Sequence, residues 1–172
     1  NQLSGKTGTK FGVVRYGNVI GSRGSVIPFF KKLIKEGKDM PLTHKEMTRF
    51  FITLEDAVKF VFKSLESSLG EEIFIPIMNS IYIYDLIKII DKNVKIKIIG
   101  LRPGEKIHET LCGEAESRNT YYYKDHYRIY PEFKSNKERK GKKVPNNFSY
   151  YSNSKNSLDI NAITKLIRKT KI

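Results

Sequence analysis

Apolar and polar residues alternate along the chain in a pattern that predicts short strands and amphipathic helices. The apolar residues of Phe11–Arg15 predict a first strand, and the polar, glycine-containing stretch Gly17–Ser25 predicts a loop. Apolar residues at helical spacing then predict a helix over Val26–Glu36, with Gly37 at the place of a C-cap glycine. Glycines let a backbone approach a ligand closely, and a helix N-terminus presents unpaired N–H groups. We therefore expect an α/β fold in which this loop binds an anion.

The middle of the chain repeats this alternation. Thr53 is a good N-cap residue for a second helix, because acidic residues follow it in the first turn. That helix is expected to have one apolar face, formed by Leu54, Ala57, Val58, Val61, Phe62 and Leu65. Strands are predicted at Glu72–Ile77, where the proline indicates an edge position or the end of the strand, and at Val94–Ile99.

The second half of the chain continues with weaker patterns. A helix is predicted over Ser80–Asp91, a short helix over Ile107–Leu111 and a C-terminal helix over Ile160–Arg168. The tyrosine-rich segment Asn119–Tyr130 is expected to form an extended arm or a strand. Cys112 is expected to be a buried thiol of the short helix.

Charge and cysteine content restrict the classes of function. The chain has 32 Lys and Arg against 18 Asp and Glu, a formal charge of +14, which points to phosphates, nucleic acid or an anionic surface as partners. Its single cysteine excludes an internal disulfide framework and fits a reducing compartment, so we expect a cytoplasmic location. No apolar run approaches the length of a membrane span, and the histidines and the cysteine lack metal-ligand spacing. Neither a membrane nor a metal partner is expected.

Polar side chains follow the predicted strands and extended pieces at four places. An arginine offers a planar fork of donors that matches phosphate oxygens, and a carboxylate accepts hydrogen bonds from ribose hydroxyls. These side chains could therefore form a cage for a diphosphate: Asn18 with Arg23 and Ser25, Thr43, Arg49, and Arg102 with Glu105. Spacing alone leaves open that they are solvated surface arginines and ordinary turns.

Three blocks of the sequence resemble one enzyme family. Val14–Phe30, Met47–Thr53 and Leu101–Glu109 are similar, in order and spacing, to the C-terminal half of the inverting UDP-N-acetylglucosamine 4,6-dehydratases. These are extended short-chain dehydrogenases/reductases, and the segment Asn147–Ser154 resembles their closing segment. The resemblance implies the C-terminal part of a Rossmann-type α/β fold. It would contain the final strands of the parallel sheet and a smaller α/β substrate domain.

The resemblance also implies a division of the chain into parts. Residues 1–20 would end the dinucleotide-binding domain. Residues 21–133 would bind the UDP-sugar, with the strand at 72–77 returning to the large sheet. Residues 134–147 would form a basic exposed loop, and residues 148–172 the C-terminal tail and helix.

Residue roles follow from the resemblance by position. Asn18, Arg49 and Arg102 would contact the diphosphate, Thr43 would lie beside the uracil, and Glu105 would bind the ribose. The cleft for the sugar would be lined by Arg23, Gly24, Ser25, Val26 and Ile27. The backbone at Tyr16 and Val19 would lie against the nicotinamide of NADP, with NAD as the alternative.

The family reaction removes water from UDP-N-acetylglucosamine without net redox change. It oxidises C4 of the sugar, eliminates water across C5 and C6, reduces C6 and inverts C5, on the way to pseudaminic acid or related surface glycans. The resemblance further suggests a homo-oligomer.

The family's catalytic Tyr-x-x-x-Lys pair is expected upstream of Asn1. Three matches occur in the chain, at Tyr84–Lys88, Tyr130–Lys134 and Tyr151–Lys155, and we ascribe them to chance. Gly17, Gly21 and Gly24 do not fit the dinucleotide fingerprint. We therefore expect the chain alone to be inactive. A basic nucleic-acid-binding module and a non-catalytic UDP-sugar-binding remnant are the alternatives.

Overall fold

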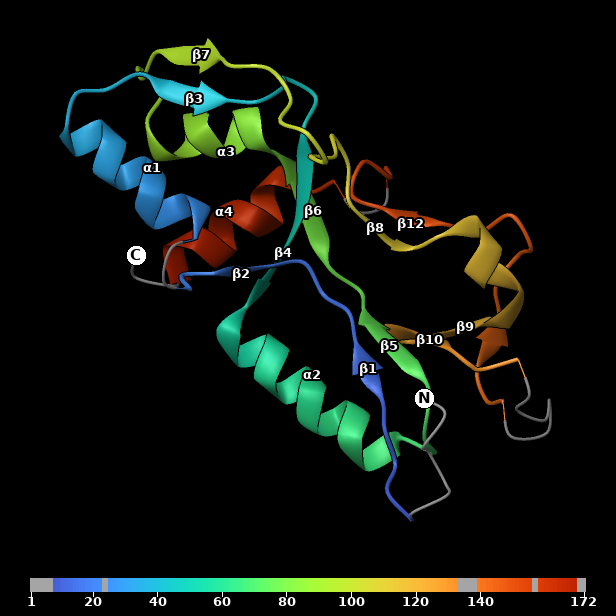
Figure 1. Ribbon diagram of the computed structural model, residues 1–172. Helices are drawn as coiled ribbons and strands as arrows, with labels where there is room; N and C mark the ends of the chain where they lie inside the picture. The colour runs from blue at the N-terminus through green and yellow to red at the C-terminus, as the bar shows by residue number, and fades with distance from the viewer. Residues whose placement is uncertain (1–7, 23–24, 133–138, 156–157, 170–172) are drawn as a thin grey trace. The chain divides into compact units, whose positions relative to one another are not determined.

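A computed structural model describes residues 8–22, 25–132, 139–155 and 158–169 of the chain. It divides into two compact units, each assembled from segments that are distant in sequence (Figure 1). Unit 1 is formed by Asn1–Tyr16, Glu55–Ile77 and Thr110–Tyr150. Unit 2 is formed by Gly17–Leu54, Met78–Glu109 and Tyr151–Ile172. How the predicted domains divide the functional roles stays a prediction.

Unit 1 contains a five-stranded sheet in which only the first pair of strands is parallel. The strand order is β1 (Val13–Val14), β5 (Ile73–Pro76), β10 (His126–Ile129), β9 (Thr120–Tyr123) and β11 (Lys142–Lys143). β1 pairs in parallel with β5, and the remaining neighbours are antiparallel. The predicted tyrosine-rich arm is thus the β9–β10 hairpin. Unit 1 also holds β8 (Thr110–Cys112), the 3₁₀ helix η1 (Glu114–Asn119) and all but the first residue of α2 (Leu54–Ser67).

The interior of unit 1 is built around a buried arginine. The guanidinium carbon of Arg128 lies 4.5 Å from the ring centre of Phe74 and 4.9 Å from that of Tyr123. Its Nη1 and Nη2 donate hydrogen bonds to the carbonyl and hydroxyl of Ser67 at the end of α2. His126 stacks on Tyr123 with ring centres 4.6 Å apart. Aromatic faces attract such cations and stabilise the buried arginine.

The apolar face predicted for α2 is largely exposed. The helix buries Ala57, Phe60 and Ser64. In contrast, Phe62 is 61% exposed and Leu65 is 70% exposed. Sequence periodicity therefore located the helix correctly but not its buried face. Of the buried residues of α2, only Ala57 belongs to the predicted apolar face.

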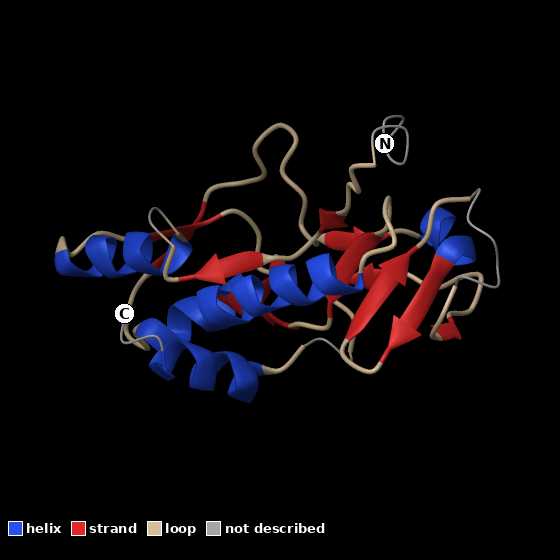
Figure 2. Ribbon diagram, turned by 90° about the horizontal axis from the view of Figure 1, so that it is seen from below, coloured by secondary structure: helices blue, strands red, loops and turns tan. Residues whose placement is uncertain are grey.

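Unit 2 combines two small sheets with three helices. β2 (Asn18–Ile20), β4 (Thr48–Thr53) and β6 (Asn79–Tyr82) form one sheet, and β3 (Met40–Leu42) pairs in parallel with β7 (Ile96–Ile98). The helices are α1 (Val26–Lys35), α3 (Ile83–Ile90) and α4 (Ile160–Lys169). β12 (Tyr150–Tyr151) lies where the segments of the two units meet in the sequence. Figure 2 shows how short the strands are and how much of the chain is loop.

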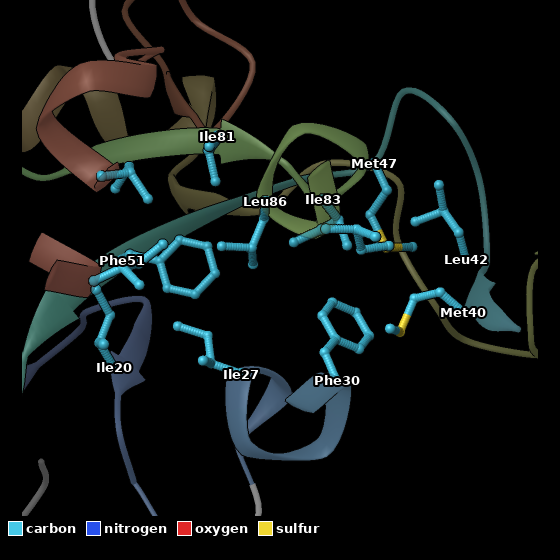
Figure 3. Close-up of a cluster of buried hydrophobic side chains, with 13 residues drawn as sticks. Ile20, Ile27, Phe30, Met40, Leu42, Met47, Phe51, Ile81, Ile83 and Leu86 are labelled. Carbon is cyan, nitrogen blue, oxygen red and sulfur yellow. The ribbon is translucent and has the colours of Figure 1, made fainter. Parts of the chain in front are cut away.

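A continuous and largely aliphatic core holds unit 2 together. Side chains from α1, β3, β4 and α3 converge on it (Figure 3), and Ile163 of α4 completes it. Phe30, Leu42 and Leu86 are at most 3% exposed. Burying a side chain of this size contributes about 1.5–3 kcal/mol. This core fixes the elements from which the pocket residues described below project.

Several local expectations need correction. The predicted loop Gly17–Ser25 contains β2, which pairs in parallel with β4. Gly17 permits this approach, because a Cβ there would collide with Phe50. Residues 107–111 form no helix; Thr110–Cys112 is β8, and Cys112 is fully buried on that strand.

Two other elements were predicted in part. The segment predicted as one helix over Ser80–Asp91 begins with the end of β6 and becomes α3 only at Ile83. Pro76 is the last residue of β5, as predicted, but β5 lies between β1 and β10 and not at an edge. Within the described part of the chain, no helix combines the length and apolar character needed to cross a lipid bilayer.

Candidate functional site

A pocket of about 290 Å³ in unit 2 brings five of the predicted polar residues together. They come from β2, from β4, from the turn after β3 and from the loop that follows β7: Asn18, Thr43, Arg49, Arg102 and Glu105. The rest of the lining forms an apolar wall, part of which belongs to the core (Figure 3). It includes Phe29, Phe30, Leu42, Met47 and Ile83. A pocket with an apolar wall and a few convergent polar groups is the usual form of a small-molecule site.

Glu105 is held in the pocket by a tight turn and by both of its carboxylate oxygens. The Glu105 N–H donates to the carbonyl of Arg102 at 3.0 Å, and Gly104 between them has a φ of +78°. Thr43 Oγ1 donates to Glu105 Oε1 at 3.2 Å, and the Arg102 N–H donates to Oε2 at 3.3 Å. The carboxylate is therefore oriented before any ligand binds.

Arg49 fastens the loop that carries Arg102 and Glu105 to β4. Its Nη1 donates to the carbonyls of Thr48 and Ile107 at 2.7 and 2.9 Å, and its Nη2 to the carbonyl of Lys106 at 2.8 Å. Its Nε lies 3.7 Å from Glu109 Oε1. The side chain is 15% exposed and lines the pocket. Its positive charge thus faces the pocket while its donors hold the protein backbone.

Glu109 completes this arrangement behind Arg49. Its Oε2 accepts a hydrogen bond from the Phe50 N–H at 3.0 Å. Burial raises the pKa of the Glu109 carboxyl, and the Phe50 N–H and the Arg49 charge oppose that rise. The contact between Glu109 and Phe50 joins a loop to a strand that is distant in the sequence. Sequence periodicity reports only on neighbouring residues and therefore does not predict it.

A second pocket of about 230 Å³ adjoins the first, since Asn18 and Val26 line both. It also contains Val19, Ser25 and Ile27, three of the residues predicted to face cofactor or sugar. The Ser25 hydroxyl is buried and has no hydrogen-bond partner among the described residues. Its volume is below that of pockets that enclose a whole small-molecule ligand, which run from about 300 Å³ upward.

Three predicted residues remain to be placed. Arg23 and Gly24 lie outside the described residues. Tyr16 belongs to unit 1 and is 39% exposed. Among the residues that the structure describes, no three His, Cys, Asp or Glu side chains gather to hold a metal ion.

Comparison with known proteins gives close relatives. A Campylobacter jejuni protein named UDP-N-acetylglucosamine 4,6-dehydratase (inverting) is 48% identical over 165 residues, which cover 90% of this chain and 49% of that protein. A second C. jejuni protein of the same name is 46% identical with the same coverage. The chain thus spans about half the length of the curated relatives it matches.

The chain also resembles proteins of known structure. Pen from Bacillus thuringiensis matches with a TM-score of 0.84 and 33% identity, over 97% of this chain and 52% of that one. A UDP-N-acetylglucosamine 4-epimerase from Methanobrevibacter ruminantium, solved with UDP-N-acetylmuramic acid, matches with a TM-score of 0.52 and 25% identity, over 60% of this chain and 37% of that one. These likenesses confirm the predicted Rossmann-type α/β fold of the short-chain dehydrogenases/reductases.

A family model described as polysaccharide biosynthesis protein matches residues 1–131. Together with the relatives, this match confirms the resemblance that the three sequence blocks predicted. The chain belongs to the polysaccharide biosynthesis protein family, and its relatives within that family include the inverting UDP-N-acetylglucosamine 4,6-dehydratases.

Proposed function

We propose that this chain is the UDP-sugar-binding part of a nucleotide-sugar 4,6-dehydratase that acts on UDP-N-acetylglucosamine. The observation that carries the proposal is the pocket in which Asn18, Thr43, Arg49, Arg102 and Glu105 meet. Two guanidinium groups and one oriented carboxylate are complementary to a diphosphate joined to a ribose. The product would be a 4-keto-6-deoxy sugar nucleotide for pseudaminic acid or another surface glycan.

Each pocket residue has a role in this proposal. Arg102, on the exposed loop, would pair with the diphosphate as a fork of donors, and Arg49 would contribute mainly its charge because its donors already hold carbonyls. Glu105 would accept hydrogen bonds from the ribose hydroxyls. The uracil would lie beside Thr43 against the apolar wall, and Asn18 would contact the diphosphate between the two pockets.

The smaller pocket would serve the sugar and one ring of the cofactor. A bound nicotinamide cofactor, NADP or NAD, supplies reversible hydride transfer to the sugar. Val19, with Tyr16, would lie against its ring, and Ser25, Val26 and Ile27 would line the sugar cleft and exclude water from it. A homo-oligomer and a cytoplasmic location remain part of the proposal.

We also infer that the chain by itself does not catalyse the reaction. Of the three Tyr-x-x-x-Lys matches, Tyr84–Lys88 lies in α3, where Lys88 Nζ donates to the carbonyls of Lys92 and Val94, both at 3.0 Å. Those bonds give this lysine a structural role at the end of the helix. The match that begins at Tyr130 ends at Lys134, outside the described residues. Turnover of UDP-N-acetylglucosamine by the purified chain would overturn this inference.

Binding of UDP, measured by titration calorimetry, tests the pocket. Arg102→Ala should weaken UDP binding by about tenfold or more, because a charge-assisted hydrogen bond contributes about 1.5–3 kcal/mol. Arg118→Ala is a matched control, since it removes an equal charge from an exposed position of η1 in unit 1. The proposal fails if the unchanged chain does not bind UDP, or if both variants bind it equally well.

A further inference from the structure

One fully buried serine, Ser152, joins three separate segments of unit 2. Its Oγ lies 2.7 Å from Thr48 Oγ1 and 3.2 Å from the carbonyl oxygen of Thr48, on β4. The same Oγ accepts a hydrogen bond from the Glu109 N–H at 2.8 Å. A single hydroxyl therefore connects the C-terminal tail, β4 and the end of the loop that follows β7.

Neighbouring bonds strengthen this junction. The Ser152 N–H donates to the Glu109 carbonyl at 2.9 Å, so the two residues pair in both directions. Ser80 Oγ donates to the Ser152 carbonyl at 2.6 Å, and His108 Nδ1 lies 2.8 Å from Thr48 Oγ1. Thr48, Ser80 and Ser152 are all 0% exposed. Hydrogen bonds in such a dry network are strong and directional, and a missing member leaves the others unsatisfied.

The junction lies directly behind the pocket. Arg49 follows Thr48 on β4, and Glu109 ends the loop that carries Arg102 and Glu105. Between β7 and β8 this loop contains no helix or strand. At its start, the Ile99 N–H donates to the Leu42 carbonyl at 2.9 Å, and at its end Ser152 holds Glu109. Arg102 and Glu105 lie between these two attachments. The bonds of Arg49, the Thr48 N–H bond to the Ile107 carbonyl and the contact of Thr43 with Glu105 also hold the loop.

We propose that Ser152 is a positioning residue for the pocket: it holds β4 and the 99–109 loop so that Arg49 and Arg102 converge on the ligand diphosphate. This inference rests on the proposed function of the pocket. Ser152 does not line the pocket and acts only through the residues it holds. It gives the closing segment Asn147–Ser154 a role that the sequence alone did not suggest.

The test is a comparison of two buried serines. Ser152→Ala should lower the affinity for UDP by about tenfold, because the loss of one buried hydrogen-bond partner frees the loop. Ser64→Ala is the matched control: Ser64 is 3% exposed and its Oγ donates to the Phe60 carbonyl at 2.7 Å, inside α2 of unit 1. We expect both variants to lower Tm, and only Ser152→Ala to weaken UDP binding.

A double-mutant cycle separates positioning from general loosening. If Ser152 acts through Arg102, then Ser152→Ala should change UDP affinity by less than about threefold in an Arg102→Ala background, since coupled residues are not additive. If Ser152→Ala does not fold, Thr48→Val removes the hydroxyl on the other side of the same contact and should give the same cycle.

Each outcome has one meaning. Unchanged UDP affinity in Ser152→Ala, an equal loss in Ser64→Ala, or full additivity with Arg102→Ala overturns the positioning role while the proposed function stands. Absence of UDP binding by the unchanged chain overturns the proposed function and the positioning role together.

Discussion

Unit 2 buries a continuous and largely aliphatic core, whereas unit 1 packs aromatic rings around Arg128. Both units also leave large apolar side chains exposed. Those of unit 1 lie mostly on α2 and near β1, an edge strand of the sheet, and include Phe11, Val13 and Phe62. A hollow of about 290 Å³ beside them is lined by Val14, Val61, Leu65 and Phe74, among others.

The two units are therefore stabilised by different kinds of contact. Unit 2 can keep its pocket in shape with its own core, since helices and strands of the same unit cover one another. Unit 1 holds its sheet through hydrogen bonding and cation–aromatic contacts and leaves an apolar surface of the kind that promotes association. The pocket is thus built on the unit that has the continuous core.

The largest expected effect contrasts two leucines in helices. Leu86→Ala in α3 should lower the free energy of unfolding by about 2–5 kcal/mol, because Leu86 is fully buried and its loss leaves a cavity. Leu65→Ala in α2 should change it by less than about 0.5 kcal/mol, because Leu65 is 70% exposed. Urea denaturation followed by circular dichroism measures both. Equal losses would show that α2 is as well covered as α3.

The second prediction compares how two carboxyl groups, one in each unit, change the unfolding free energy with pH. The pKa of Glu109 is raised, mainly by burial, so the folded state binds more protons than the unfolded state above the ordinary Glu pKa of about 4.3. Its contribution to the unfolding free energy therefore falls as pH rises through that window. Lys63, with a smaller effect from His126, lowers the pKa of Asp125 to about 2, so its contribution is lost as pH falls below about 4.

Denaturation of Glu109→Gln and Asp125→Asn along a pH series checks these signs. In the unchanged chain, Glu109 makes the unfolding free energy fall as pH rises above about 4.3, and Glu109→Gln should reduce that fall. Asp125 makes the unfolding free energy fall as pH drops below about 4, and Asp125→Asn should reduce that fall. The effect of Asp125 should be small, because its side chain is 53% exposed and solvent screens the ion pair. Identical pH profiles for all three proteins would contradict the opposite assignment of the two carboxyls.

The smallest expected change in stability is that of Leu65→Lys. It places a charge on the exposed face of α2 and should leave Tm within a few degrees, since surface substitutions stay within about 0.5 kcal/mol. It should reduce concentration-dependent association measured by light scattering. Lys59→Leu, which adds an apolar side chain at an exposed position of the same helix, should act in the opposite direction.

Local patterns predicted most helices, because a helix is largely specified by its own residues. Both ends of α1 were predicted within one residue, with Gly37 at φ +63° after its end. β2 was missed because its partner, β4, lies some thirty residues further along the chain. The short helix expected near Glu109 is absent because Ser152 and Arg49 bind the backbone groups there.

The site shows the same division. Arg102 and Glu105 were found because they flank a Pro-Gly turn, and Thr43 because it follows an extended segment. The apolar wall at Phe29 and Met47, and the buried hydroxyl of Ser152, carry no chemical signal in sequence. They acquire a role only through contacts between distant segments, such as the one between Thr48 and Ser152, which are 104 positions apart.

That separation has a consequence for biosynthesis. On a ribosome, β4 and the loop with Arg102 emerge well before Ser152, and the contact between Thr48 and Ser152 must wait until Ser152 has emerged. Long-range contacts of this kind slow folding because an extended loop of chain must first be closed. The nucleotide binding proposed for the pocket would therefore require Ser152 to be in place, and UDP binding by a newly made chain would report that this contact has formed.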